Sequence, residues 1–550
     1  MRVLKWIAGI ALALGVIVWI AFDSILLRLP GILDGIRNPT GPNHEISWNR
    51  GPDTPAAPAK DRLPNVVVIV ADDLGYNDLS VLGGGVAGGT VKTPNIDSIA
   101  QSGVRFSSGY SASGTCAPSR AAILSGRYPT RFGFEFTPTP KGMSSLLVRF
   151  FDRPGVLRRP VFYEDRVGDA LPFERMGMPP SEVSIAEVLR GAGYHTGHIG
   201  KWHLGDVEGM APHEQGFDES LLMGSGKYLP DDDPQVVNSK QDFDPIDIFL
   251  WPTMKYAARF NGSPRFAPKG YLTDYYTDQA VAFIDANRNR PFFLYLAHWA
   301  PHTPLQASKA DYDALAHIQD HRLRVYAAMI RALDRGVGRV LEALRANGLE
   351  ENTLVIFTSD NGGANYVGLD GLNDPFRGWK ISLFEGGIHV PFFIKWPARI
   401  TPGQVYAEPV HHVDIFSTAA GAAGAKVPDD RTIDGVNLVP FVTGNASQPK
   451  RPLFWRQGHY QAVLFDGWKL QVSERPAKDW LFHLAEDPTE QRNVATERPD
   501  KVKELKGLLA AHNAQQMPPA WPCLGEFPIS IDKTLAEPES PDDEYVYWPN

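Results

Sequence analysis

The stretch NVVVIVA at residues 65–71, followed at once by Asp72 and Asp73, decides the predicted fold. An unbroken β-branched run of this length is typical of a strand that is buried on both faces of a parallel sheet. The abrupt change to two acidic residues marks its carboxyl end. We therefore predict a central strand that delivers two carboxylates to one edge of a sheet.

The same form recurs twice along the chain. The run PFFLYLA at residues 291–297 leads to His302, and TLVIFTS at residues 353–359 leads to Asp360 and Asn361. The carboxyl ends of parallel strands meet at one edge of a sheet, and ligands bind beyond that edge. The polar residues after all three strands are therefore expected to converge.

Helix signals lie between these strands. Thr93 followed by Pro94 is an N-cap with proline at the first helical position. Ser184 and Glu187 have the spacing of a capping box, and residues 321–347 read as a long amphipathic helix. Strands that alternate with helices predict an α/β fold with a doubly wound sheet.

Length and composition suggest one large domain and one smaller one. The chain has 550 residues, of which 43% are hydrophobic and 21% charged, as in a well-buried globular protein. The formal net charge of -9 argues against nucleic acid as a partner, because phosphate backbones are bound by clustered Lys and Arg. The predicted parts are an N-terminal anchor or signal segment (1–36), a Pro-rich linker (37–64), a main domain (65–420), a smaller α+β domain (421–516) and a tail (517–550).

The N-terminus carries a membrane signal. Residues 6–22 contain no charge, and these 17 residues are at the short end of the length that spans a bilayer. Arg2 and Lys5 would hold the front end in the cytoplasm, which places the body in the periplasm. A cleaved signal peptide is the alternative to an anchor in the inner membrane. With Cys116 and Cys523 as its only cysteines, the exported chain can form at most one disulfide.

The acidic residues at the strand ends suit a metal ion. Asp72, Asp73, Asp360 and Asn361 offer hard oxygen ligands with no thiolate or histidine among them, which favours Ca²⁺ or Mg²⁺ over zinc or copper. Either pair alone could equally be a set of turn-forming residues. The recurrence of such pairs at two strand ends favours the metal site.

One of the two cysteines lies in the stretch CAPSR, from Cys116 to Arg120. Pro118 at a first helical position would place Cys116 just before a helix over residues 119–126, where free N–H groups and the helix dipole favour an anion. Such a cysteine could be a nucleophile with a lowered pKa. It could also be a small buried hydrophobic residue.

The wider pattern resembles a known family. CAPSR and its continuation to Gly126 are similar to the signature C-x-P-S-R-x-x-x-L-T-G of type I sulfatases, members of the alkaline phosphatase superfamily, with Ser125 in the threonine place. Further segments resemble the family's motifs in the family's order: residues 193–205, 300–304, 358–362, 378–380, 385–391 and 481–493. The resemblance spans residues 65–495.

The resemblance implies a specific chemistry. It implies an alkaline phosphatase-like mixed sheet flanked by helices, with a smaller C-terminal α+β domain. It also implies that a formylglycine-generating enzyme converts Cys116 to formylglycine, whose hydrated aldehyde is the nucleophile. The family's calcium ligands match Asp72, Asp73, Asp360 and Asn361, together with the converted residue at 116; Mg²⁺ is the less favoured ion.

The other site residues follow from the same motifs. Arg120, Lys201 and Lys380 match residues that surround the sulfate with positive charge. His203 matches the histidine that removes a proton so that sulfate is expelled. His302 matches the one beside the leaving oxygen, where it or Lys380 would protonate the departing alcohol.

Two positions depart from the family's motifs, and a third is a candidate for contact with the substrate. Ser125 keeps the hydroxyl of the usual threonine. His389 stands where the E-G-G-x-R-V-P motif usually has arginine, so an ion pair there would depend on pH. Ser225 is the nearest candidate for the family's substrate-side serine.

The resemblance predicts an enzyme that hydrolyses sulfate monoesters, either aryl sulfates or sulfated carbohydrates. A phosphonate monoester or phosphodiester hydrolase of the same superfamily is the alternative, and a non-catalytic binder of sulfated glycans is a remote third. The aromatic-rich segments at residues 134–180 and 228–270 are expected to cover the pocket.

Overall fold

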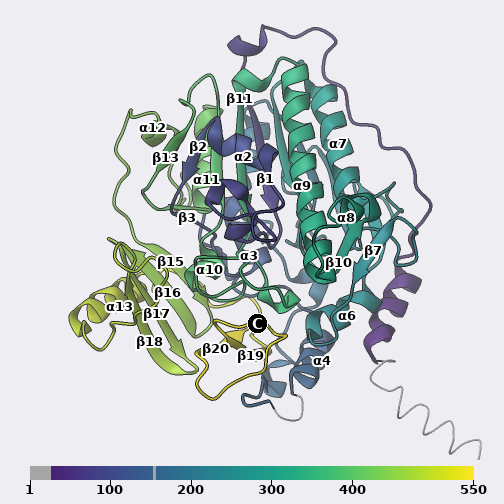
Figure 1. Ribbon diagram of the computed structural model, residues 1–550. Coiled ribbons are helices and arrows are strands. Elements are labelled where there is room, and N and C mark those ends of the chain that lie inside the picture. The colour runs from purple at the N-terminus through teal and green to yellow at the C-terminus, as the bar shows by residue number, and fades with distance from the viewer. Residues whose placement is uncertain (1–25, 153–155) are drawn as a thin grey trace, which may run out of the picture.

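The computed structural model describes residues 26–152 and 156–550 (Figure 1). The predicted anchor at residues 6–22 lies outside the described residues. Across the described ranges, no helix combines the length and the apolar character that crossing a bilayer requires.

A nine-stranded sheet forms the centre of the molecule, in the order β13-β2-β12-β11-β1-β9-β5-β6-β8. The strand β1 (Asn65–Ala71) lies at its middle and pairs in parallel with β11 (Thr353–Ser359) and β9 (Phe292–Ala297). The sheet is mixed because β12 and β8 pair antiparallel with their neighbours. The predicted α/β fold is confirmed. The remaining strands are β2 (Val104–Phe106), β5 (His195–Gly200), β6 (Glu219–Gly226), β8 (Tyr256–Phe260), β12 (Phe392–Lys395) and β13 (Gln404–Tyr406).

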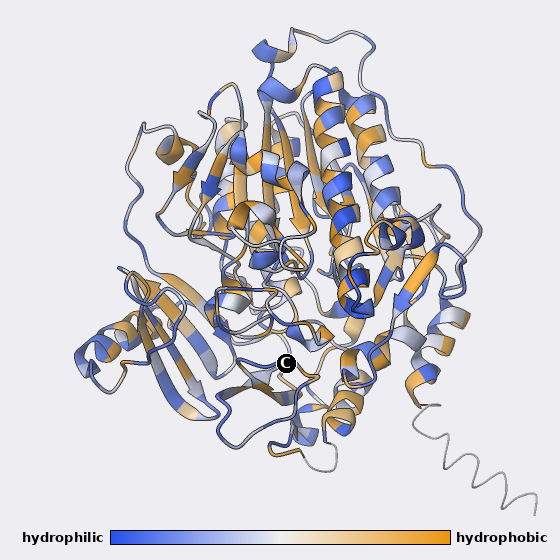
Figure 2. Cartoon of the chain, in the orientation of Figure 1, coloured by the Kyte–Doolittle hydropathy of each residue, from blue (hydrophilic) through white to orange (hydrophobic). Residues whose placement is uncertain are grey.

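Helices cover both faces of this sheet, whose strands are largely hydrophobic (Figure 2). Alternate residues of β1 point to opposite faces, so Val67 and Ile69 join one core and Val66 and Val68 the other. The first core holds α2 (Pro94–Gln101), α7 (Leu272–Asn287) and α9 (His321–Ala346), and the second holds α3 (Cys116–Ser125), α5 (Ile185–Gly191) and α11 (Val413–Ala422).

The helix starts follow the sequence signals with one exception. Pro94 is the first residue of α2. At the start of α5 the Ser184 hydroxyl accepts a hydrogen bond from the Glu187 N–H, and the Glu187 carboxylate accepts one from the Ser184 N–H. The predicted start of α3 is wrong, because Cys116 is itself the first helical residue. Thr115 is extended and takes the N-cap position, so Pro118 falls within the first turn, where its missing N–H costs no intrahelical bond.

A second sheet lies beside the first. Its antiparallel strands are β15 (Leu453–Gln457), β16 (Tyr460–Phe465), β17 (Trp468–Glu474) and β18 (Ala477–His483). The helix α13 (Pro499–Asn513) packs on it through Leu505 and Leu509. The tail lies against the body, since β19 (Gly525–Ser530) pairs with both β20 (Tyr545–Pro549) and β4 (Val161–Phe162).

Shorter elements complete the fold. Two strand pairs, β3 with β14 and β7 with β10, lie outside the large sheets. Their bounds are β3 (Gly109–Tyr110), β7 (Val236–Ser239), β10 (Leu305–Ser308) and β14 (Val410–His411). Further helices are α4 (Lys141–Phe151), α6 (Pro245–Thr253), α8 (Lys309–Asp313), α10 (Glu385–Ile388) and α12 (Val439–Val442), and residues 26–37 at the start of the described chain are also helical.

A buried ionic cluster joins the two sheets. Lys469 of β17 lies 2.7 Å from Glu385 and 3.0 Å from Glu490. His389, at the position where the motif usually has arginine, lies 2.8 Å from Glu385 through Nδ1 and 2.9 Å from the Ser107 carbonyl through Nε2. Burial opposes the charge of Glu385, but Lys469 and His389 outweigh it and lower the pKa of this carboxyl to about 2.

The capping box of α5 can be tested by substitution of its serine. Replacing Ser184 by alanine removes the acceptor of the Glu187 N–H and the hydroxyl that donates to the Gln215 carbonyl. We expect a loss of about 1–2 kcal/mol of stability, visible as a lower denaturant midpoint. Ser145→Ala is the matched control, because Ser145 is exposed and its hydroxyl donates to the Gly142 carbonyl within its own helix α4. Equal midpoints for the two variants would contradict the assigned role.

Candidate active site

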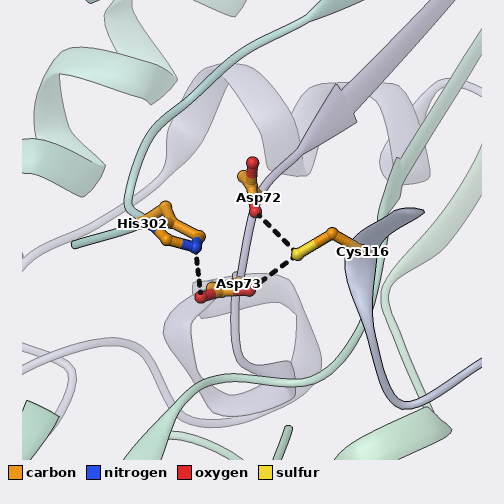
Figure 3. Close-up of side chains that lie close together, drawn as sticks. All are labelled: Asp72, Asp73, Cys116 and His302. Carbon is orange, nitrogen blue, oxygen red and sulfur yellow. Dashed lines mark hydrogen bonds and ion pairs between the residues drawn. The ribbon is translucent and has the colours of Figure 1, made fainter. Parts of the chain in front are cut away.

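The predicted site residues meet at the carboxyl edge of the central sheet. Asp72 and Asp73 follow β1, and Asp360 follows β11. His302 lies in the loop after β9, and Cys116 opens α3. Figure 3 shows four of these side chains directed toward one another. The convergence expected from the strand ends is therefore present.

Cys116 contacts both carboxylates that follow β1. Its Sγ lies 3.5 Å from Asp72 Oδ1 and 3.8 Å from Asp73 Oδ1, and His302 Nε2 lies 3.5 Å from Asp73 Oδ2 (Figure 3). The four side chains offer ligand atoms that all lie within 4.8 Å of one another. This group could hold a metal ion.

Asp360 and Asn361 border the same group. The Asp73 N–H donates to Asp360 Oδ1 at 3.2 Å, and Asn361 Nδ2 donates to Asp73 Oδ1 at 2.8 Å. Asn361 Oδ1 is buried and has no hydrogen-bond partner among the described residues. A buried amide oxygen without a donor is costly, and a hard cation would satisfy it. The donor set therefore fits Ca²⁺ or Mg²⁺.

Three cations neutralise the three carboxylates. Arg120 lies 3.2 Å from Asp72 and 2.7 Å from Asp360, and all three side chains are fully buried. Lys201 lies 2.7 Å from Asp72, and Lys380 lies 2.7 Å from Asp73. The formal charges of these six groups sum to zero. A divalent cation would make the site positive and suited to an anionic ester.

The surroundings raise the pKa of the Cys116 thiol well above its ordinary value. Burial is the main cause and the Asp360 charge adds to it, against the opposing effect of Lys201 and Lys380. Burial and Asp360 also raise the pKa of Asp72 to about 7. The surrounding protein groups therefore do not favour a Cys116 thiol of lowered pKa, which was one of the two interpretations of the CAPSR stretch. Neither cysteine is in a disulfide.

Both predicted histidines have a pKa well below the ordinary value. Burial is the main cause for each, and Lys201 lowers the value further for both, while Asp73 opposes the shift at His302. His302 Nδ1 lies 2.5 Å from the Thr303 carbonyl, so it donates there and leaves Nε2 toward Asp73. His203 has a positive φ of 64° and a buried Nδ1 without a partner among the described residues. A neutral His203 can accept a proton.

The sequence reasoning missed three residues of this site. The Tyr366 hydroxyl donates to Asp73 at 2.9 Å and receives a hydrogen bond from Lys380 at 3.2 Å. The Trp299 indole stacks on His302 at 3.9 Å between centroids and lies 4.7 Å from the Lys201 ammonium. Position in the chain could have indicated both, because they lie within a few residues of recognised motifs.

The third missed residue is Asp247, at the start of α6. Its carboxylate accepts a hydrogen bond from the Thr303 hydroxyl at 2.7 Å and another from the Trp251 indole at 2.7 Å. It thereby fixes the backbone next to His302. Asp247 belongs to the aromatic-rich segment 228–270, which lies between the motifs, so no motif could mark it. Ser225, the candidate for the substrate-side serine, lies on β6 just before that segment. Its hydroxyl accepts from the Lys255 N–H at 2.8 Å, which is a structural contact at a bulge of β6.

Family models match two parts of the chain. The model described as Sulfatase matches residues 64–425, which cover the central sheet and the converging side chains. The model described as N-sulphoglucosamine sulphohydrolase, C-terminal, matches residues 378–515, which include the second sheet.

Individual proteins agree with the family models. Steryl-sulfatase of Mus musculus is 32% identical over 481 residues, covering 74% of this chain and 70% of the relative. N-acetylgalactosamine-6-sulfatase of Homo sapiens is 34% identical over 400 residues, covering 72% and 68%. The crystal structure of Ps i-CgsB in complex with k-i-k-neocarrahexaose has a TM-score of 0.68 at 32% identity, covering 84% of this chain and 95% of that one. The chain therefore belongs to the sulfatase family and is a sulfuric ester hydrolase.

Proposed function

We propose that this sulfatase hydrolyses sulfate monoesters through a formylglycine made from Cys116 and a bound Ca²⁺. The observation that carries the proposal is the position of Cys116. It opens a buried helix between two carboxylates, yet its surroundings disfavour the thiolate. Cys116 thus lies at the centre of the site but is unsuited to react as a thiol. Its conversion to another group would explain this position.

The converted residue and the ion would supply the nucleophile. A hydrated aldehyde at 116 would attack sulfur with one hydroxyl and expel sulfate with the second, and Ca²⁺ would lower the pKa of that attacking hydroxyl. Asp72, Asp73, Asp360 and Asn361 would hold the ion together with residue 116. An all-protein set of oxygen ligands favours Ca²⁺ over Mg²⁺, which keeps several waters.

The chain's own cations would bind the sulfate group. Arg120, Lys201 and Lys380 are held in place by the carboxylates that they neutralise. Donors fixed before the substrate arrives stabilise developing charge without reorganisation. Lys201 and His302 are further positioned by Trp299, which contacts both.

Two proton transfers remain. His203 is neutral and partly exposed, so it can take the proton of the hydroxyl that expels sulfate. His302 and Lys380 both face Asp73, and either is placed to protonate the departing oxygen.

A sulfated carbohydrate is the favoured substrate, because the similar Ps i-CgsB was solved with k-i-k-neocarrahexaose. We place the reaction in the periplasm, from the N-terminal signal in the sequence.

Substitution of the modified residue is the first test. Cys116→Ala removes the nucleophile, so turnover of an aryl sulfate should fall by at least about a thousand-fold. Cys523→Ser is the matched control, since this second buried cysteine donates to the Gly525 carbonyl and is not among the side chains that converge at the sheet edge, and it should retain activity. Mass analysis of the peptide containing residue 116 should find the aldehyde. A thiol throughout active protein would overturn the mechanism.

Removal of the ion is the second test. Chelation should lower both the melting temperature and the turnover, because a ligand that binds only the folded state stabilises it. Added Ca²⁺ should restore both more effectively than Mg²⁺. In Asn361→Ala, which loses the unpartnered Oδ1, the melting temperature should respond less to Ca²⁺. A melting curve indifferent to chelator and to Ca²⁺ would exclude the metal site.

Paired substrates separate the sulfatase from the phosphorus-directed alternative. The ratio of kcat/KM values for an aryl sulfate and for the matching aryl phosphonate and phosphodiester should favour the sulfate, because three fixed cations suit a compact sulfate group. A larger value for either phosphorus ester would assign the chain to the alternative class. Tight binding of a sulfated glycan without turnover of any ester would instead support the non-catalytic binder.

A further inference from the structure

The helix of residues 26–37 presents an apolar stripe to the outside. Its side chains Leu29, Ile32, Leu33 and Ile36 are 44%, 55%, 41% and 72% exposed. Residues spaced by three, four and seven positions share one face of a helix. These are four of the nine exposed large hydrophobic side chains among the described residues, so the exposure is concentrated on this face. A concentrated apolar face marks a surface that another body covers.

The opposite face of this helix is fixed to the body. Gly31 is buried, and a Cβ there would lie 2.4 Å from the Pro252 carbonyl oxygen of α6. Asp34 pairs with Arg265, which follows β8. Figure 1 shows the helix in purple beside α6 at the edge of the molecule. The apolar stripe therefore has a set direction relative to the catalytic domain.

The chain that follows the helix holds it in the same place. The Gly41 N–H donates to the Arg265 carbonyl at 2.9 Å. Trp48 is 6% exposed, and its indole donates to Gln279 of α7 at 3.0 Å. The segment predicted as a linker is thus extended but lies along the body, so it does not allow the helix to turn its stripe inward.

Charge and sequence indicate what covers the stripe. Arg28 and Arg37 are exposed and fall on the two flanks of the stripe, whereas Asp34 is neutralised on the inner side. Apolar residues flanked by arginines are typical of helices that lie in the interface of a bilayer with anionic lipids. In the sequence, the uncharged residues 6–22 lie only a few positions before residue 26.

We propose that the helix of residues 26–37 lies on a phospholipid surface, with the four apolar side chains among the acyl chains and the two arginines at the headgroups. The lipid then lies next to α6, whose Asp247 bonds Thr303 beside His302. Membrane contact would therefore orient the active site as well as attach the protein. This inference is independent of the proposed catalytic mechanism.

Site-directed fluorescence on the full chain tests the contact. Ile36→Cys can be labelled selectively with an environment-sensitive dye, because Cys116 and Cys523 are only 3% and 7% exposed. The matched control is Val405→Cys, an apolar position on β13 that is 57% exposed and lies at the opposite edge of the sheet from β8. Both proteins are reconstituted in vesicles of phosphatidylcholine and phosphatidylglycerol with acyl-chain nitroxide lipids.

The dye at position 36 should emit at shorter wavelength and be quenched by the nitroxides, while the dye at 405 shows neither change. The double substitution Arg28→Glu and Arg37→Glu should weaken the quenching at position 36. The loss should grow with the phosphatidylglycerol content of the vesicles, because the glutamates repel anionic headgroups. Equal, water-like emission at both positions would overturn the proposal. Shielding at 36 without nitroxide quenching would also overturn it, because the cover would then be protein, either a second copy or residues 1–25. Turnover of a small aryl sulfate by each labelled protein checks that it is folded.

Discussion

Burial of three carboxylates at one sheet edge is the constraint on which the site depends. Asp72, Asp73 and Asp360 are at most 2% exposed, and a buried charge without a partner costs several kcal/mol. Their partners come from distant parts of the chain, with Arg120 on α3, Lys201 after β5 and Lys380 after β11. The site is therefore neutral only once the whole sheet has formed, which ties the binding of an anion to the completeness of the fold.

The smaller domain and the tail take part in this arrangement. Arg377, three residues before Lys380, pairs with Asp532 and Glu544 of the tail and donates to the Glu490 carbonyl at 2.7 Å. Lys469 of the second sheet reaches Glu385 a few residues further on. The loop that carries Lys380 is thus held from outside the central sheet. The second sheet and the tail contribute no side chain to the carboxylate group, but they fix the one cation that lies farthest from a regular element.

Much of this arrangement could be predicted because strand ends and capping residues act locally. The run at residues 65–71 determined a buried central strand, and the two acids after it could only lie at the sheet edge. Asp247 could not be identified in the same way, because its role arises from a contact with the distant Thr303 and no spacing rule encodes that. Tyr366 and Trp299 lie close to recognised motifs, but their partners Asp73 and Lys201 come from distant segments. The helix α3 starts earlier than predicted. Its N-cap is the extended Thr115, whereas the position of Pro118 had suggested an N-cap further along the chain.

The complete burial of the first helix turn of α3 has a consequence for the order of events in the cell. Cys116 is 3% exposed, and Ala117, Ser119 and Arg120 are not exposed at all. An enzyme that must read this sequence and convert its cysteine cannot reach it in the folded protein. The conversion proposed for Cys116 would therefore compete in time with folding, and the fraction of active molecules would be decided while the chain is still open, before any substrate is present.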